Sequence, residues 1–208
     1  MGKAYRTVGV AALLAVAAAA PARADFWKSI DHFPERDDSG IFSRSNQKRA
    51  DALAIGGVVG LALWEGSESR LGRTAWQSVD AALMTAASTE TLKRVFQRPR
   101  PIDNPDPSVW FAGSNNRSFP SGEVAMMAAF VTPFIREYHA DHPAAWALAV
   151  IPVYMGKARM ASQAHWLTDV IAGGAIGTGV GYYSGGRETP LVLSIGRTHT
   201  FVGLRYRF

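Results

Sequence analysis

TAWQSVDAALMTAASTETLKRVFQ, residues 74–97, carries apolar side chains at the spacing of an α-helix. Residues three or four positions apart lie on one helical face, and this spacing is kept by Val79, Ala82, Leu83, Ala86 and Ala87. The stretch therefore predicts a helix with one apolar side. Residues 121–138, 143–156 and 166–183 predict further helices, the last of them rich in glycine, which permits close contact between helices. An all-α bundle follows from this pattern.

The chain of 208 residues has the length of one domain. Within the chain we expect a leader before this domain and a short tail after it. Residues 1–24 combine Lys3 and Arg6 with an apolar run and end in a small-residue cleavage site, which predicts a secretory signal peptide; an uncleaved anchor is the alternative. We expect an irregular lead-in with a short helix over 25–50. The helical domain should cover 51–186, and a small C-terminal β-hairpin 187–208.

Composition narrows the functional classes. Without residues 1–24, which hold three basic and no acidic side chains, the formal net charge falls from +5 to +2, so we expect no nucleic-acid partner. Cysteine is absent, which rules out a disulfide, a thiolate nucleophile and a Cys-ligated metal. The charge-free runs after the leader are shorter than a membrane span, although association with a membrane surface stays open. We expect an exported protein, periplasmic or on the outer face of the inner membrane.

Basic side chains gather where the helix over 74–97 meets a long, proline-rich loop. The sequence there is KRVFQRPRP, residues 93–101. Lys93 and Arg100 can converge on one anion, with Arg binding it through two N–H groups and Lys acting as a point charge. A basic helix end that interacts with the helix dipole is the simpler alternative. This motif alone gives Arg98 no role.

A second motif, FPSGE at 119–123, opens the next expected helix. Ser121 offers a hydroxyl, and the Gly122 backbone N–H belongs to a helix N-terminus, which favours anions. A common turn is the alternative interpretation of Pro-Ser-Gly. A third motif, ARMASQAHWLTD at 158–169, places His165 and Asp169 four residues apart, so that on a helix they would share a face. The Asp169 carboxylate could then fix the imidazole tautomer and leave Nε2 free to attack phosphorus, with Arg159 approaching from a preceding loop.

The order and spacing of the three motifs resemble the signature of the type 2 phosphatidic-acid phosphatase and vanadium haloperoxidase superfamily. Lys93-x6-Arg100-Pro101, Pro120-Ser121-Gly122 and Arg159-x5-His165-x3-Asp169 match that signature. The resemblance implies a helical bundle of the acid phosphatase/vanadium haloperoxidase type. It also implies hydrolysis of phosphate esters or anhydrides without a metal or other cofactor. His165 would form a phosphohistidine and Asp169 would orient it. The phosphate-binding residues would be Lys93, Arg100, Ser121, Gly122 and Arg159.

Glu123 departs from the signature, which has a second histidine at this position. The family residue would protonate the leaving oxygen, so Glu123 is the expected catalytic acid if its pKa is raised, although nearby cations oppose this. Three hypotheses follow: an exported phosphatase acting on monoesters or diphosphates that are small or lipid-linked, a non-catalytic protein that binds phosphate or a lipid headgroup, and a vanadate-dependent haloperoxidase. The sequence leaves the substrate and the oligomeric state undetermined.

Overall fold

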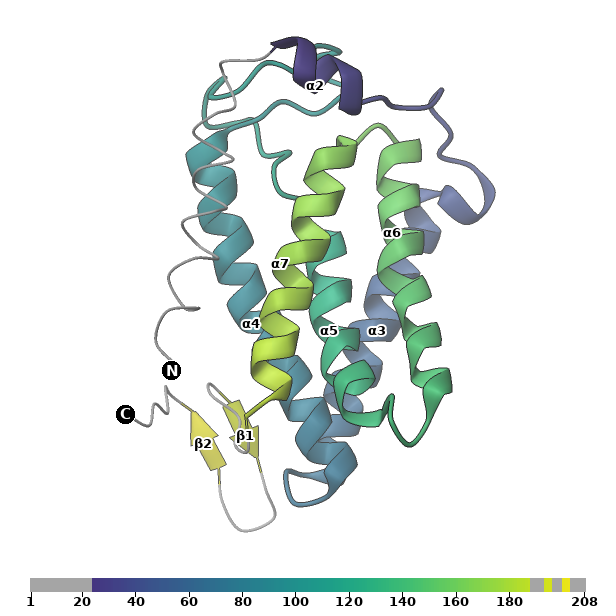
Figure 1. The fold of residues 1–208 in the computed structure, drawn as a ribbon, viewed down its shortest axis with the longest axis vertical. Coiled ribbons are helices and arrows are strands. Elements are labelled where there is room, and N and C mark those ends of the chain that lie inside the picture. The colour runs from purple at the N-terminus through teal and green to yellow at the C-terminus, as the bar shows by residue number, and fades with distance from the viewer. Residues whose placement is uncertain (1–23, 188–192, 196–199, 203–208) are drawn as a thin grey trace.

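The structure, a computed structural model, describes residues 24–187, 193–195 and 200–202. Helices α3 to α7 run roughly side by side along the long axis, and α2 lies across one end, here called the upper end (Figure 1). The helices are α2 (Ala24–Ile30), α3 (Arg44–Glu65), α4 (Arg70–Phe96), α5 (Gly122–Tyr138), α6 (Val150–Ala161) and α7 (Leu167–Gly185), with 3-10 helices η2 (Gly40–Phe42) and η3 (Pro143–Ala149). The predicted all-α bundle is confirmed.

Helix α5 forms the centre of the bundle, because it packs against α4, α6 and α7. Its Val124, Met127 and Phe130 join Ala82 of α4 and Met155 of α6 in one apolar cluster. The predicted apolar face of residues 74–97 is only partly buried: Val79 and Ala82 are buried, whereas Leu83 and Ala87 are exposed. Small residues make up much of the buried face instead, which lets α4 approach its neighbours closely: Ser78, Ala81, Thr85 and Thr89.

Glycines spaced four residues apart bring α7 into contact with the backbone of α5. A Cβ placed on Gly173 would lie 2.4 Å from the Ser121 carbonyl oxygen, and one on Gly177 would lie 2.0 Å from that of Ala125. Real Cβ atoms do not approach oxygen this closely. The glycine-rich sequence of α7 therefore fixes how near its first turns lie to the start of α5, as the sequence predicted.

We expect Gly177→Ala to lower the free energy of unfolding by about 2 kcal/mol or more, because the added methyl group must displace the α5 backbone. Gly179 is the matched control, since it is exposed on the same helix and has open space around its Cα. Gly179→Ala should raise stability by about 0.5–1 kcal/mol through helix propensity. Urea unfolding of both variants measures the difference; equal effects would show that the close contact does not constrain the helix pair.

The lead-in differs from the expectation. Helix α3 begins at Arg44, because the Ser43 hydroxyl caps it by accepting the Asn46 backbone N–H. The region 143–156 is a 3-10 helix followed by the first half of α6. The expected signal peptide lies almost wholly outside the described residues. Two short strands, β1 (Leu193–Ile195) and β2 (Thr200–Val202), pair antiparallel, but the rest of the expected hairpin is not described and it stays a prediction.

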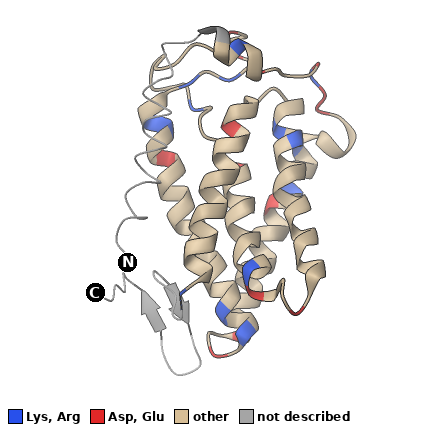
Figure 2. Cartoon of the chain, in the orientation of Figure 1, with Lys and Arg blue, Asp and Glu red and all other residues tan. Residues whose placement is uncertain are grey.

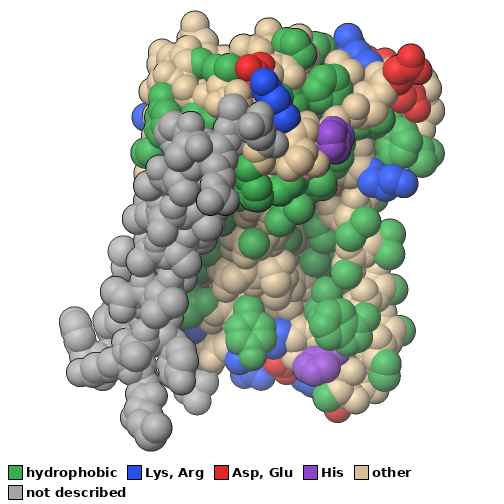
Figure 3. All heavy atoms as spheres, turned by 45° about the horizontal axis from the view of Figure 1, so that its top comes forward, with side chains coloured by type: hydrophobic (Ala, Val, Ile, Leu, Met, Phe, Trp, Pro, Cys, Tyr) green, Lys and Arg blue, Asp and Glu red, His purple; other side chains and the backbone are tan. Residues whose placement is uncertain are grey.

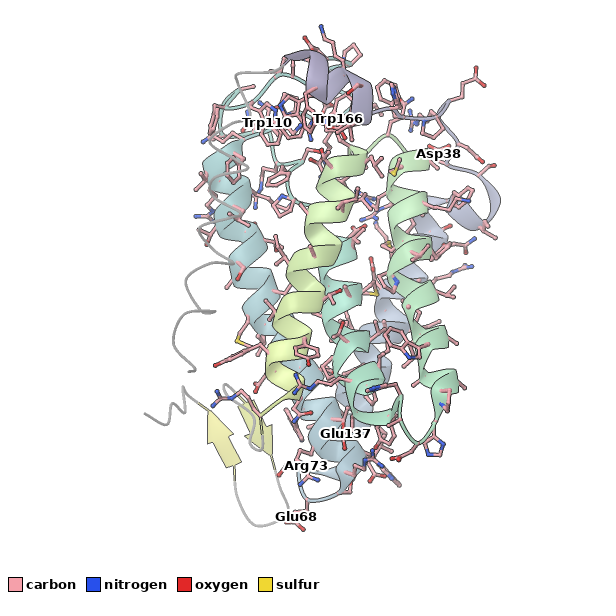
Figure 4. All side chains as sticks on the ribbon, in the orientation of Figure 1. Asp38, Glu68, Arg73, Trp110, Glu137 and Trp166 are labelled. Carbon is pink, nitrogen blue, oxygen red and sulfur yellow. The ribbon has the colours of Figure 1, made fainter. Side chains whose placement is uncertain are left out.

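A long loop joins α4 to α5 across the upper end (Figure 1). Aromatic contacts hold it: the Trp110 ring lies 5.2 Å from the rings of both Phe119 and Trp27, and Phe96 of α4 packs edge-on against Phe119. Trp110 and Trp166 both lie at this end, below α2 (Figure 4). Within the described part of the chain, no helix is long and apolar enough to cross a bilayer.

Candidate active site

The structure brings the three motifs together at the upper end of the bundle. Charged residues lie mostly toward the two ends of the helices (Figure 2), and basic and acidic side chains lie close together on the upper surface (Figure 3). Lys93 is in the last turn of α4, and Arg159 is in the last turn of α6. Asp169 is in the first turn of α7. Two helices that end, α4 and α6, and two that begin, α5 and α7, therefore meet here.

His165 is the central residue of this cluster. The sequence predicted that His165 and Asp169 share a helix, but α7 begins only at Leu167, so His165 lies just before it. Its Nδ1 nevertheless lies 3.7 Å from Asp169 Oδ2. Burial lowers the pKa of His165 to about 4, although Asp169 opposes this, and the charges of Lys93 and Arg159 lower it further. The imidazole is therefore neutral at pH 7.

Ser118 determines which imidazole nitrogen carries the proton. Its hydroxyl donates a 2.5 Å hydrogen bond to Asp169 Oδ2 and lies 3.5 Å from His165 Nδ1. Since the single hydroxyl proton points to the carboxylate, Nδ1 must be the donor toward Ser118. Nε2 then keeps its lone pair, and it makes no hydrogen bond to any residue that the structure describes. The motifs gave no signal for Ser118.

Asp169 is fully buried and accepts hydrogen bonds from several donors. Besides Ser118, Arg98 Nη1 donates to Oδ1 at 2.7 Å, and the Trp166 backbone N–H donates to Oδ2 at 3.0 Å. Burial raises the pKa of Asp169, but the neighbouring His165 imidazole and the charge of Arg98 outweigh it and keep the pKa below its usual range. Asp169 therefore stays ionised while it caps α7. The sequence had assigned Arg98 no role.

Lys93 and Arg100 supply positive charge from the end of α4 and the loop after it. Lys93 Nζ donates to the carbonyl oxygens of Arg117 and Pro120, which leaves one of its three N–H groups for a ligand. Burial and the charge of Arg100 lower the pKa of Lys93 to about 8, although Asp169 opposes the shift. Arg100 is half-buried, and its guanidinium has no hydrogen bond or ion pair with any described residue. Both cations can therefore bind an anion.

Ser121 and Gly122 form the start of α5, next to Asp169. The Ser121 N–H donates to the Asp169 carbonyl oxygen at 2.9 Å, which ties α5 to α7. Ser121 Oγ is buried and has no hydrogen-bond partner. A Cβ on Gly122 would lie 3.5 Å from Lys93 Cε, which places this glycine against the Lys93 side chain. An unpaired hydroxyl and a helix N-terminus therefore lie beside a cation, as an anion site requires.

Arg159 enters the cluster from helix α6, not from a loop as the sequence predicted. Its Nη1 donates to Gln47 Oε1 at 3.0 Å, and Gln47 is itself completely buried. Burial lowers the pKa of Arg159 to about 10, with the charge of Glu123 opposing. The guanidinium is therefore still charged at neutral pH. Gln47 belongs to α3, so this helix orients one of the expected phosphate-binding residues.

Glu123 is held by two arginines. Arg44 donates to both of its carboxylate oxygens, at 2.6 and 3.0 Å, and Arg159 Nε lies 3.0 Å from Oε2. The Arg159 contact is an ion pair without hydrogen-bond geometry, because Nε has no hydrogen-bond partner. Burial raises the pKa of Glu123, but the Arg44 hydrogen bonds and the charge of Arg159 outweigh it and lower the pKa. A carboxylate held in this way does not carry a proton at neutral pH.

A second carboxyl lies near Glu123. Asp51 of α3 is half-buried, and its Oδ1 has no hydrogen-bond partner. Burial and the charge of Glu123 raise the pKa of Asp51, although Arg44 and Arg159 oppose this. Of the two neighbouring carboxyls, Asp51 therefore takes up a proton more readily than Glu123. Nothing in the three motifs pointed to Asp51 or to Arg44.

Comparison with known protein families gives one match. A family model described as the PAP2 superfamily covers residues 74–185, more than half of the chain. The chain belongs to the PAP2 superfamily. Members of this superfamily are generally phosphatases, which agrees with the motif resemblance. No match was found among curated proteins or among solved structures.

The PAP2 match begins after α3, so part of the site lies outside the region that defines the family. Arg44, Gln47 and Asp51 come from α3, and Asp31 follows α2.

In the described part of this PAP2 chain, no group of three or more His, Asp or Glu side chains is arranged to hold a metal ion.

Proposed function

We propose that this PAP2 chain is an exported phosphatase that cleaves phosphate monoesters or diphosphates without a metal, through a phosphohistidine at His165. One observation carries the proposal: a buried, neutral imidazole lies near Lys93 and Arg159, which are themselves near Arg100, and its Nδ1 faces Ser118 and Asp169. A neutral histidine that keeps its proton on Nδ1 has a free lone pair on Nε2 and can act as a nucleophile. The three cations can bind the charged oxygens of a phosphoryl group.

The reaction takes two steps at this site. The Nε2 lone pair attacks phosphorus, the bond from phosphorus to the leaving oxygen breaks, and its electron pair stays on that oxygen. The imidazole then carries positive charge, which the ionised Asp169 stabilises through Nδ1 and Ser118. Water attacks phosphorus in the second step, the N–P bond breaks with its electron pair returning to Nε2, and the proton that the water loses leaves with the phosphate product, so that His165 returns to its neutral form. Ser121 and the Gly122 N–H would hold the equatorial oxygens through both steps.

The state of Glu123 sets the substrate preference in this proposal. Because its pKa is lowered by the two arginines, Glu123 does not serve as the proton donor that the sequence suggested. Substrates whose leaving group needs little protonation, such as diphosphates, should therefore react best. The same observation favours a second candidate function, in which the chain binds phosphate or a lipid headgroup without turnover.

The setting of the reaction is also part of the proposal. The leader-like residues 1–24 support export, to the periplasm or the outer face of the inner membrane. The substrate would be a phosphate-bearing small molecule or lipid. Exposed apolar residues on α3, including Leu53, Leu63 and Trp64, would favour contact with a membrane surface.

Phosphate release by the purified full chain, measured from pH 3 to 10 with and without a chelator, tests the function. We expect the chelator to have no effect. We expect kcat/KM to fall below about pH 4, where His165 becomes protonated, and above about pH 8, where Lys93 loses its charge. The panel should contain an aryl monoester, an alkyl monoester, a soluble diphosphate and a lipid phosphate in micelles.

Each outcome decides between the candidates. Release that the chelator abolishes would overturn the metal-independent mechanism. Binding of the same esters without any release would establish the binding function instead. A plateau that continues well above pH 8 would show that the Lys93 ammonium group is not needed for substrate capture.

A further inference from the structure

Arg98 is completely buried and bridges two carboxylates. Its Nη1 donates to Asp169 Oδ1 at 2.7 Å, and its Nη2 donates to Asp31 Oδ2 at 2.6 Å. The side chains of all three residues have no exposed surface. A buried charge is costly unless it is paired, so the two carboxylates stabilise this guanidinium where it has no contact with solvent. Asp31 therefore completes a buried ion triad that ends at the carboxylate beside His165.

Further contacts fix the Arg98 guanidinium in one orientation. Its carbon lies 4.3 Å from the centre of the Trp110 ring and 5.1 Å from that of Trp166. Nη2 also donates to the Pro107 carbonyl oxygen, and Nη1 to the Thr168 hydroxyl. A planar guanidinium between rings and acceptors cannot rotate without losing several contacts. The guanidinium therefore holds the Asp169 carboxylate at a fixed position relative to the loop.

Asp31 is fixed as firmly as Arg98. Its Oδ1 accepts the Thr168 backbone N–H at 2.8 Å, and its Oδ2 accepts the Thr168 hydroxyl at 2.7 Å. Thr168 precedes Asp169 directly in the first turn of α7. Asp31 thus holds the backbone and Arg98 holds the side chain at the same turn, so the Asp169 carboxylate is constrained from two sides.

We propose that Arg98 and Asp31 are positioning residues for the reaction: they hold the Asp169 carboxylate in the orientation that keeps His165 in its reactive tautomer. The triad of Asp31, Arg98 and Asp169 has a net charge of −1. One negative charge therefore remains to stabilise the phosphorylated imidazole. Arg98 compensates the other, so the two carboxylates do not repel each other strongly. This inference rests on the proposed function and extends it beyond the motif residues.

The first test uses Arg98→Gln, which removes the charge and the fork of N–H donors. We expect kcat to fall about 10²-fold with little change in KM, because substrate does not touch Arg98. In the background of Asp169→Asn, the same substitution should cost at most a few-fold, since Arg98 acts through Asp169. Arg94→Gln is the matched control, because Arg94 is an exposed arginine on α4 that pairs with Glu90 one helical turn away. Its kcat should equal that of the wild type.

Two outcomes of the kinetic test would overturn the proposal. One is a folded Arg98→Gln variant with wild-type kcat, and the other is full additivity with Asp169→Asn. If Arg98→Gln does not fold, Asp31→Asn and Arg98→Lys replace it. Lys keeps the charge but cannot bridge two carboxylates in a fork, so Arg98→Lys should also lose kcat. Wild-type kcat in both replacements would reject the positioning role.

A second readout does not need turnover. ¹⁵N NMR of histidine-labelled protein reports the tautomer of His165, whose signal is assigned by its loss in His165→Gln. In the wild type we expect a protonated Nδ1 and a bare Nε2; Arg98→Gln should give a mixture of tautomers. An unchanged tautomer would reject the positioning role even in a chain that releases no phosphate. Absence of phosphate release with the expected NMR change would reject the proposed function alone.

Discussion

Replacing His165 with glutamine should reduce phosphate release by at least about 10⁴-fold and leave phosphate binding nearly intact. Glutamine has similar polarity and size but no nucleophilic nitrogen. Lys93, Arg100, Ser121 and Arg159, which would hold the phosphoryl oxygens, are unchanged by this substitution. The measurements are phosphate release with a soluble diphosphate and calorimetric binding of inorganic phosphate to the same preparation.

The phosphoenzyme gives a direct check on the same residue. A short reaction with radiolabelled substrate, quenched in base, should label the wild type, because a phosphohistidine survives base and is lost in acid. The His165→Gln variant should carry no label. His142→Gln is the control, because His142 is an exposed residue just before η3 and has no part in the cluster. Label that persists in His165→Gln would assign the nucleophile to another side chain.

Replacing Glu123 with histidine should raise turnover of an alkyl monoester by about 10²-fold and change turnover of a diphosphate much less. A histidine at this position would supply the proton that a poor leaving group needs, and general acids contribute roughly 10²–10⁴-fold. Glu123 cannot supply it because Arg44 and Arg159 keep it ionised. The ratio of kcat values for the two substrates measures the effect.

Glu123→Gln separates proton donation from charge. It removes the carboxylate and frees Arg44 and Arg159 for substrate, but adds no acid. We expect Glu123→Gln to lower KM for both substrates and to leave the ratio of their kcat values at the wild-type level. Equal gains in the Gln and His variants would mean that the glutamate acts by repelling substrate, and that no proton donor is missing from the site.

The motifs predicted the location of the site because each lies at a helix end. Lys93, Gly122, Arg159 and Asp169 are in terminal turns, and the bundle fold brings these turns to one place. The helices predicted over 74–97, 121–138 and 166–183 are observed as α4, α5 and α7, with bounds that differ by a few residues. Local sequence was therefore sufficient for the inner part of the pocket.

The supporting residues could not be predicted, because their partners are far away in the chain. Arg98 is 67 residues from Asp31 and 71 from Asp169, and Ser118 is 51 from Asp169. Arg44 precedes Glu123 by 79 residues. A polar residue in a polar stretch looks like solvent-exposed surface until the fold shows what lies opposite it. The sequence also did not predict that His165 lies just before α7. The helix begins at Leu167 because the Asp169 carboxylate accepts the Trp166 backbone N–H and caps it there.

Helix α3 and the segment after α2 lie outside residues 74–185, yet Arg44, Gln47 and Asp31 contact the pocket from there. Cutting the chain at the family boundary would therefore remove one partner from each of Arg98, Arg159 and Glu123, and would leave Arg98 with Asp169 alone and Arg159 with Glu123 alone. Grafting the family region onto another scaffold should fail for the same reason. The smallest unit that can be moved or engineered in this protein begins near Trp27, about fifty residues before the family match does.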